Sequence, residues 1–412
     1  SIGRKIFMCD SSGCWQRRAA QFLAAQGVSL LGSSMVQYAI IWYITLTTSS
    51  GKMLTLSTLC GFLPQLAVSL FGGVWADRWK RKNVMMLADA AVAAATLVLA
   101  VSMLLGSRPM WLLFAVLAVR SAGTGLQTPA AQAFLPQIVP REKLMRLGGV
   151  QSALNSLITF LSPAAGGLLL SFFPLETVLF ADILTAALGI GLTAAIRVEE
   201  NGGQSSPGAG MSGWKGLCSG LAYVKGKPGL RDLVLFQIFT MFLISPSAFL
   251  TPLLVERTFG AEVWRLTAGE MTYSAGMVLG GLLIAAWGGL SSGRLRTTLL
   301  AGGFYGLLMV GLGLSPVFPA YLVCNTLIGI TSPCYNTPMT VAIQEKVAPE
   351  AQGRVFGVLQ AASSFAMPLG MVLFGPLSDA VSLRLLFPVC GILVMAAAAL
   401  AFFRGAFREF SD

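Results

Sequence analysis

Four ionisable residues lie inside long apolar stretches of the sequence, where a charged group has little access to water. They are the acids Asp89, Asp182 and Glu270 and the base Arg120. A charge in such surroundings is costly and is usually paired or functional. A carboxyl group withdrawn from water holds a proton more readily, which suits proton exchange. The pattern predicts proton coupling at these residues, with a structural hydrogen bond or salt bridge as the alternative for each.

The residue types that are missing exclude several kinds of chemistry. The sequence has no histidine, so neither a His-dependent catalytic pair nor a His proton relay can form. Its seven cysteines are scattered, and Cys9 and Cys14 lack the second pair that a zinc site needs. The sequence shows no phosphate-binding loop. We therefore expect no enzyme activity, no metal site and no cofactor.

The elements that position these residues are long apolar helices. Hydrophobic residues make up 55% of the chain and charged residues only 11%, against about 25% charged residues in soluble domains. Apolar runs of about 20 residues can cross the membrane as helices, which satisfy their own backbone polar groups. We expect an all-α integral membrane protein with twelve transmembrane helices. The predicted spans are 19–46, 53–75, 83–105, 109–128, 144–172, 175–196, 231–256, 268–290, 296–314, 317–342, 354–377 and 384–404.

The distribution of basic residues predicts the orientation in the membrane. The net charge of +11 could indicate nucleic-acid binding, but the basic residues lie in short loops between apolar spans. Of the 28 Lys and Arg residues, 22 fall on one side of the predicted spans and five on the other. Basic loops stay in the cytoplasm. We therefore expect a multi-pass membrane protein with both termini cytoplasmic and no nucleic-acid partner.

The two halves of the chain resemble each other. Thr128-Pro129 recurs as Thr337-Pro338 and Gln151 recurs as Gln360, at one constant offset. Such a parallel repeat predicts two pseudo-symmetric six-helix bundles with a solute site between them. The expected parts are a cytoplasmic N-terminal segment 1–18, a bundle 19–196, a cytoplasmic linker 197–230, a bundle 231–404 and a cytoplasmic tail 405–412.

The loop after the second span carries a recognisable motif. Residues 73–82 read Gly-Val-Trp-Ala-Asp-Arg-Trp-Lys-Arg-Lys. This sequence resembles the cytoplasmic signature of the major facilitator superfamily, with Lys80 where that family has a glycine. The resemblance implies that the loop latches the two halves, and a simple basic anchor loop is the alternative. The latch residues by this resemblance are Gly73, Asp77, Arg78 and Arg81.

Two further motifs resemble the same superfamily. Arg120-Ser-Ala-Gly123 is similar to its arginine–glycine motif, although one residue shorter between the Arg and the Gly. The fifth span matches four positions of its antiporter motif, while Ile158 and Ser162 replace glycines expected there. Small residues and a proline favour close packing and a kink, which suits a hinge for efflux, and packing alone is the alternative. The four matching residues are Gly149, Pro163, Gly166 and Gly167.

The resemblance also implies where a solute would bind. In this superfamily the first, fourth, seventh and tenth helices line the cavity. Here those spans offer aromatic and neutral hydrogen-bonding side chains, which suit bulky amphipathic solutes. Any of these aromatic residues could instead lie at the membrane interface. The cavity candidates are Gln26, Gln37, Tyr38, Trp42, Gln127, Phe236, Gln237, Phe242, Asn325, Tyr335 and Asn336.

The chain as a whole is similar to the drug-efflux branch of the superfamily, close to bacterial macrolide exporters. Gly61-Phe-Leu-Pro64 and Gly353-Arg-Val-Phe356 support this resemblance. It implies a monomeric antiporter of the bacterial cytoplasmic (inner) membrane that exports hydrophobic or amphipathic macrolide-type compounds by proton-coupled alternating access and confers antibiotic resistance. The expected partners are a small amphipathic substrate, protons and the lipid bilayer. The alternatives are a facilitator, a lysolipid flippase or a siderophore exporter of the same fold.

Overall fold

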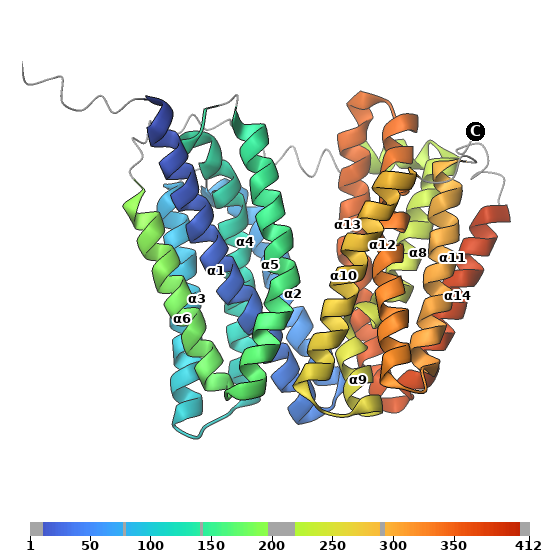
Figure 1. Ribbon diagram of the computed structural model, residues 1–412. Coiled ribbons are helices and arrows are strands. Elements are labelled where there is room, and N and C mark those ends of the chain that lie inside the picture. The colour runs from blue at the N-terminus through green and yellow to red at the C-terminus, as the bar shows by residue number, and fades with distance from the viewer. Residues whose placement is uncertain (1–10, 77–79, 141–142, 197–218, 289–292, 404–412) are drawn as a thin grey trace, which may run out of the picture. The chain divides into compact units, whose positions relative to one another are not determined.

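The computed structural model describes residues 11–76, 80–140, 143–196, 219–288 and 293–403, and all its regular elements there are α-helices (Figure 1). The first half contains α1 (Ser11–Thr48), α2 (Gly51–Ala76), α3 (Arg81–Leu104), α4 (Met110–Ile138), α5 (Leu144–Phe172) and α6 (Leu175–Ala195). The second half contains α8 (Pro228–Phe249), α9 (Thr251–Phe259), α10 (Val263–Trp287), α11 (Arg294–Leu314), α12 (Phe318–Lys346), α13 (Pro349–Ala380) and α14 (Leu383–Phe403).

The helices follow the predicted spans, with two main differences. The fourth helix, predicted to end at residue 128, continues as α4 to Ile138. Span 231–256 is not continuous, because α8 ends at Phe249 and α9 begins at Thr251. Pro252 lies in the first turn of α9, and a proline cannot donate the backbone hydrogen bond that would continue α8. Nine of the described helices are long and apolar enough to cross a membrane alone. α2, α10 and α12 are not among them, and the last two carry polar residues that line a cavity.

The chain forms two compact units. The first comprises residues up to Ile41 and the described part of Cys60–Gly210, and the second comprises Trp42–Leu59 and the described part of Met211–Asp412. The end of α1 and the start of α2 therefore pack with the second half of the chain. The bundle boundaries expected at residues 196 and 231 stay a prediction.

The same packing pattern occurs in both units. In the first unit α3 packs against α4 and α6, and in the second unit α11 packs against α12 and α14. The third helix of each half thus contacts the fourth and sixth helices of its own half. The same order of helix contacts within each half agrees with an internal repeat and with the all-α fold of two related bundles.

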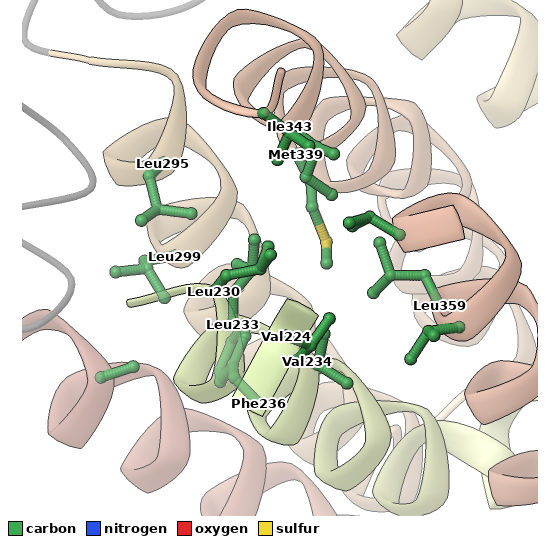
Figure 2. Close-up of a cluster of buried hydrophobic side chains, with 14 of the residues drawn as sticks. Val224, Leu230, Leu233, Val234, Phe236, Leu295, Leu299, Met339, Ile343 and Leu359 are labelled. Carbon is green, nitrogen blue, oxygen red and sulfur yellow. The ribbon is translucent and has the colours of Figure 1, made fainter. Parts of the chain in front are cut away.

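A buried apolar cluster holds α8 against α11, α12 and α13. Figure 2 shows its side chains pointing toward one another from these helices. Met339, Ile343 and Leu359 belong both to this cluster and to the lining of the cavity described below, so the cluster forms one side of the cavity wall. The labelled members are Val224, Leu230, Leu233, Val234, Phe236, Leu295, Leu299, Met339, Ile343 and Leu359.

Glycines bring α10 and α12 into direct backbone contact. A Cβ atom added at Gly276 would fall on the carbonyl oxygen of Thr326, and one added at Gly329 would fall on the carbonyl oxygen of Tyr273. Small residues are what allow such close approach of membrane helices. The contact places Glu270 on α10 near the polar face of α12.

Candidate substrate cavity and buried polar networks

The second unit contains a cavity of about 770 Å³. It is lined by residues of α8, α10, α11, α12 and α13, with Thr251 at the start of α9. Its volume lies within the range of about 300–1,000 Å³ typical of small-molecule sites. Apolar side chains and neutral hydrogen-bonding side chains share the walls. The apolar members are Met241, Ile244, Met339, Ile343, Phe356, Leu359 and Met367.

Four of the expected cavity residues line this cavity, namely Gln237, Asn325, Tyr335 and Asn336. The Tyr335 hydroxyl donates to Oε1 of Gln237 at 2.6 Å. Nδ2 of Asn325 donates to the carbonyl oxygen of Gly269 at 2.7 Å, which ties α12 to α10. These neutral groups are therefore partly engaged with one another, and they fix the shape of the wall.

Two expected residues of α8 support the cavity instead of lining it. Phe236 belongs to the apolar cluster, and its ring packs against Tyr335 with 6.3 Å between centroids. The ring of Phe242 packs against Phe374 of α13, 5.2 Å away. Sequence periodicity alone does not distinguish the cavity face of α8 from its packed face.

Glu270 lies in the cavity wall. Of the described residues that line the cavity, it is the one carboxylate, and none is Lys or Arg. Among the described residues its carboxylate makes neither a hydrogen bond nor an ion pair. Tyr273, one helical turn later on α10, also lines the cavity.

Several lining residues are absent from the sequence-based set. The hydroxyls of Ser247 and Tyr305 lie 2.9 Å apart, which joins α8 to α11. Tyr305 was missed because the resemblance directs attention to the first, fourth, seventh and tenth helices, whereas Ser247 lies on the seventh helix but was not selected there. Tyr273 could have been predicted, because it follows Glu270 by three residues and residues three apart lie on the same face of a helix. The missed polar residues are Thr240, Ser247, Thr251, Tyr273, Tyr305, Ser332, Thr340, Gln360 and Ser363.

The first unit contains a buried ion pair between Arg120 of α4 and Asp182 of α6. Nη1 of Arg120 also donates to Oγ1 of Thr96 on α3 at 2.8 Å, and Nη2 donates to the carbonyl oxygen of Ser33 on α1 at 2.8 Å. The side chains are 4% and 1% exposed. One guanidinium group therefore connects four helices. In sequence Asp182 has no cation beside it, and the fold supplies one.

Asp89 is held by neutral donors. Its Oδ1 accepts hydrogen bonds from Oγ of Ser29 at 3.0 Å and from Nε2 of Gln127 at 2.9 Å. These bonds connect α3 to α1 and α4. Gln127 was expected to face a solute, but its amide is occupied by Asp89. Gln26 is also buried, one turn from Ser29 on α1.

The other expected cavity residues lie toward the end of α1. The amide of Gln37 lies against α2, where a Cβ added at Gly61 would be 2.6 Å from its Nε2. Tyr38 is half-buried, and Trp42 is one of the largest fully buried side chains. Trp42 belongs to the second unit, whereas Gln37 and Tyr38 belong to the first.

The structure describes some residues of the loop motif 73–82 and all four matching residues of the antiporter motif. Asp77 and Arg78 lie outside the described residues, as do the surroundings of Gly73 near the end of α2. Arg81 is the first residue of α3. Residues 149, 163, 166 and 167 all lie on α5, and a Cβ added at Gly166 would be 2.8 Å from the carbonyl oxygen of Met35 on α1. Gly149 has open space around it.

A carboxylate near the end of α13 caps the N-terminus of α2. Oδ1 of Asp379 accepts from the backbone N–H of Gly51 at 2.7 Å, and Oδ2 accepts from the N–H of Lys52 at 3.1 Å. Nη2 of Arg257 on α9 donates to the same carboxylate at 2.8 Å and to the carbonyl oxygen of Ser49 at 2.5 Å. We call this set of contacts the hairpin clamp. It ties the turn between α1 and α2 to α9 and α13.

Comparisons with known proteins agree with this architecture. Residues 22–315 and 264–409 match the family model of the Major Facilitator Superfamily. Macrolide efflux protein A of Streptococcus pyogenes is 31% identical over 389 residues, which cover 93% of this chain and 95% of that protein. The multidrug efflux pump Tap of Mycobacterium tuberculosis (strain ATCC 25618 / H37Rv) is 26% identical over 401 residues, which cover 94% and 91% of the two chains.

Solved structures show the same fold. A bacterial homolog to the human lysosomal transporter Spinster, inward-facing and unoccupied, gives a TM-score of 0.70 at 16% identity, covering 96% of this chain and 98% of that one. A D-xylose-proton symporter gives 0.67 at 12% identity, covering 94% and 97%. Because the family model matches most of the sequence and a relative is 31% identical over 93% of it, this multi-pass membrane chain belongs to the Major Facilitator Superfamily, whose members are transporters and not enzymes.

Proposed function

We propose that this transporter exports hydrophobic or amphipathic drug-like compounds of the macrolide type across the bacterial inner membrane, by proton-coupled alternating access. The observation that carries the proposal is the cavity of about 770 Å³, with methionine, tyrosine and amide side chains around one carboxylate. Such walls accommodate a large amphipathic body while neutral groups orient it. The full-length similarity to a macrolide efflux protein supports the substrate class.

The geometry favours Glu270 as the proton-coupling residue. A coupling group must be reachable from solution and must exchange its proton during the transport cycle. Glu270 faces the cavity and has no hydrogen-bonding or ionic partner among the described residues. Asp182 is paired with Arg120, and Asp89 accepts two hydrogen bonds. We propose that these two acids hold the first unit together, with Arg120 as the structural partner of Asp182.

Transport in everted membrane vesicles tests the proposal. Vesicles with an imposed pH gradient should accumulate a radiolabelled macrolide, and a protonophore should abolish the accumulation. Glu270→Gln should lower the accumulation to the level of vesicles without the protein, because an amide cannot carry the exchanged proton. Asp89→Asn is the matched control and should keep proton-driven accumulation, because an amide oxygen can still accept from Ser29.

A facilitator of the same fold predicts the opposite result. It needs no titrating carboxylate, so Glu270→Gln would transport macrolide as fast as the wild-type protein, and a protonophore would have no effect. That outcome would reject proton coupling while keeping the transporter. Absence of macrolide uptake by the wild-type vesicles would reject the substrate class.

A further inference from the structure

The cavity wall carries one negative charge and, among the described residues that line it, no positive charge. We propose that Glu270 binds the single positive charge of an amphipathic substrate, such as a protonated tertiary amine, so that the cavity selects monocations over neutral compounds of the same shape. The inference rests on the proposed transport function and adds the charge of the substrate to it. The cationic group of the substrate would then be the ionic partner of the Glu270 carboxylate, which has no such partner among the described residues.

The cations nearest to Glu270 in the chain are already engaged. Arg265, on the same helix, pairs through Nε with Oε2 of Glu262 at 3.2 Å. Arg257, on α9, belongs to the hairpin clamp and donates to the carbonyl oxygen of Ser378 at 2.6 Å as well. Glu270 is half-buried, and a carboxylate partly withdrawn from water without a partner has an energetic cost that an oppositely charged ligand removes.

The other carboxylates deep in the described helices differ from Glu270 in this respect. Asp182 has the guanidinium of Arg120, and Asp89 has the donors Ser29 and Gln127. Neither of them lines the cavity. Among these three carboxylates, the one without a partner, Glu270, is therefore the one that lines a cavity large enough for a solute.

Aromatic rings line the same cavity as Glu270. Tyr273, Tyr305 and Tyr335 all line the cavity, from α10, α11 and α12. The face of a tyrosine ring attracts a cation electrostatically, and more strongly when the cation is desolvated. A carboxylate with three tyrosines therefore favours an organic cation over a small hydrated ion, which would keep its own water.

The uncharged polar groups of the cavity wall cannot select monocations over neutral compounds. The Tyr335 hydroxyl is bonded to Gln237, and the Asn325 amide is bonded to the backbone of α10. Their hydrogen bonds are partly used within the wall, whereas the charge of Glu270 is not. The body of the substrate would lie against methionines such as Met241, Met339 and Met367, which adapt to irregular shapes.

Binding to the purified full-length protein in detergent tests the proposal. The probes are a macrolide with a tertiary amine, the N-oxide of the same macrolide, which is neutral at pH 7, and tetraphenylphosphonium, a permanent cation. Glu270→Gln should weaken binding of the amine and of tetraphenylphosphonium by about 30-fold or more, because one partner of a desolvated charge pair is lost. The N-oxide should bind both proteins equally.

Glu345→Gln is the matched control, because it makes the same change at an exposed residue of α12 that does not line the cavity. It should leave the binding of all three probes unchanged. Equal weakening of amine and N-oxide by Glu270→Gln, or no weakening of either cation, would overturn the charge selection. So would failure of the wild-type protein to bind tetraphenylphosphonium. If the wild-type protein binds that cation through Glu270 but does not transport macrolide in vesicles, charge selection stands and the macrolide proposal fails.

Discussion

At the scale of single residues, the molecule treats its buried charges in two ways. Arg120 and Asp182 neutralise each other inside the first unit, with Thr96 and the backbone of Ser33 as further partners. Within the described ranges, Nε of Arg120 and Oδ1 of Asp182 have no hydrogen-bond partner. Glu270 also lacks a partner in those ranges, and it faces a cavity. The first arrangement favours a fixed structural role, and the second favours exchange with solutes.

Removal of one member of the Arg120–Asp182 pair should be strongly destabilising. Arg120→Ala leaves a carboxylate that is 1% exposed without its cation, so the free energy of unfolding should fall by about 3–5 kcal/mol. Reversible unfolding in mixed micelles measures this change. Arg294→Ala is the control, because the ion pair of Arg294 with Glu345 is exposed and should contribute at most about 1 kcal/mol.

The double variant Arg120→Met with Asp182→Leu separates pairing from packing. Two apolar side chains of similar size leave no charge unpaired, so this variant should be more stable than Arg120→Ala alone. Equal losses in the two variants would contradict the ion-pair account. They would show that the volume of the arginine side chain, and not its charge, maintains the contact between α4 and α6.

At the scale of helices, the hairpin clamp holds the beginning of α2 to α13. A helix N-terminus exposes unpaired N–H groups and a partial positive charge, both of which a carboxylate satisfies. Asp379 supplies that carboxylate from a distant part of the sequence. The hydroxyl of Thr55, one turn later, donates to the carbonyl oxygen of Met371 at 3.3 Å, so the contact continues along both helices.

Weakening the clamp should expose the face of α2 that it covers. In a Thr55→Cys background, Asp379→Asn removes the charge that holds Gly51 and Lys52, and alkylation of the cysteine should become about tenfold faster. Lys52→Ala is the control, because Lys52 contributes only its backbone N–H to the clamp, and its labelling rate should not change. An unchanged rate in Asp379→Asn would show that the clamp does not limit access to this face.

At the scale of the whole molecule, the basic loops predict a single orientation. A fluorescent protein fused after Asp412 should fluoresce, because it should lie in the cytoplasm. Alkaline phosphatase inserted after Gly106, in the turn between α3 and α4, should be active because that turn should face outward. The opposite pair of results would reverse the predicted topology. It would also place the hairpin clamp on the cytoplasmic side.

Much of the fold could be predicted because each membrane helix corresponds to one continuous apolar run in the sequence. Span 144–172 coincides with α5, and span 175–196 ends one residue beyond α6. Lipid cannot satisfy backbone polar groups, so each long apolar run must become a helix. The break at Leu250 was not predicted, although Pro252 was a signal for it. Less of the site was predicted, because the cavity face of α8 depends on which neighbours cover Phe236 and Phe242.

The helices, the repeat, the superfamily and the few ionisable residues inside the membrane spans follow from the amino-acid sequence, because apolar run length and motif spacing are local properties. The role of each of those residues depends on how the helices pack. Arg120 and Asp182 are 62 positions apart, and Asp379 and Gly51 are 328 positions apart. Which charge finds a partner and which faces a cavity is set by how the helices pack, and Glu270 is the acid that the packing leaves unpaired.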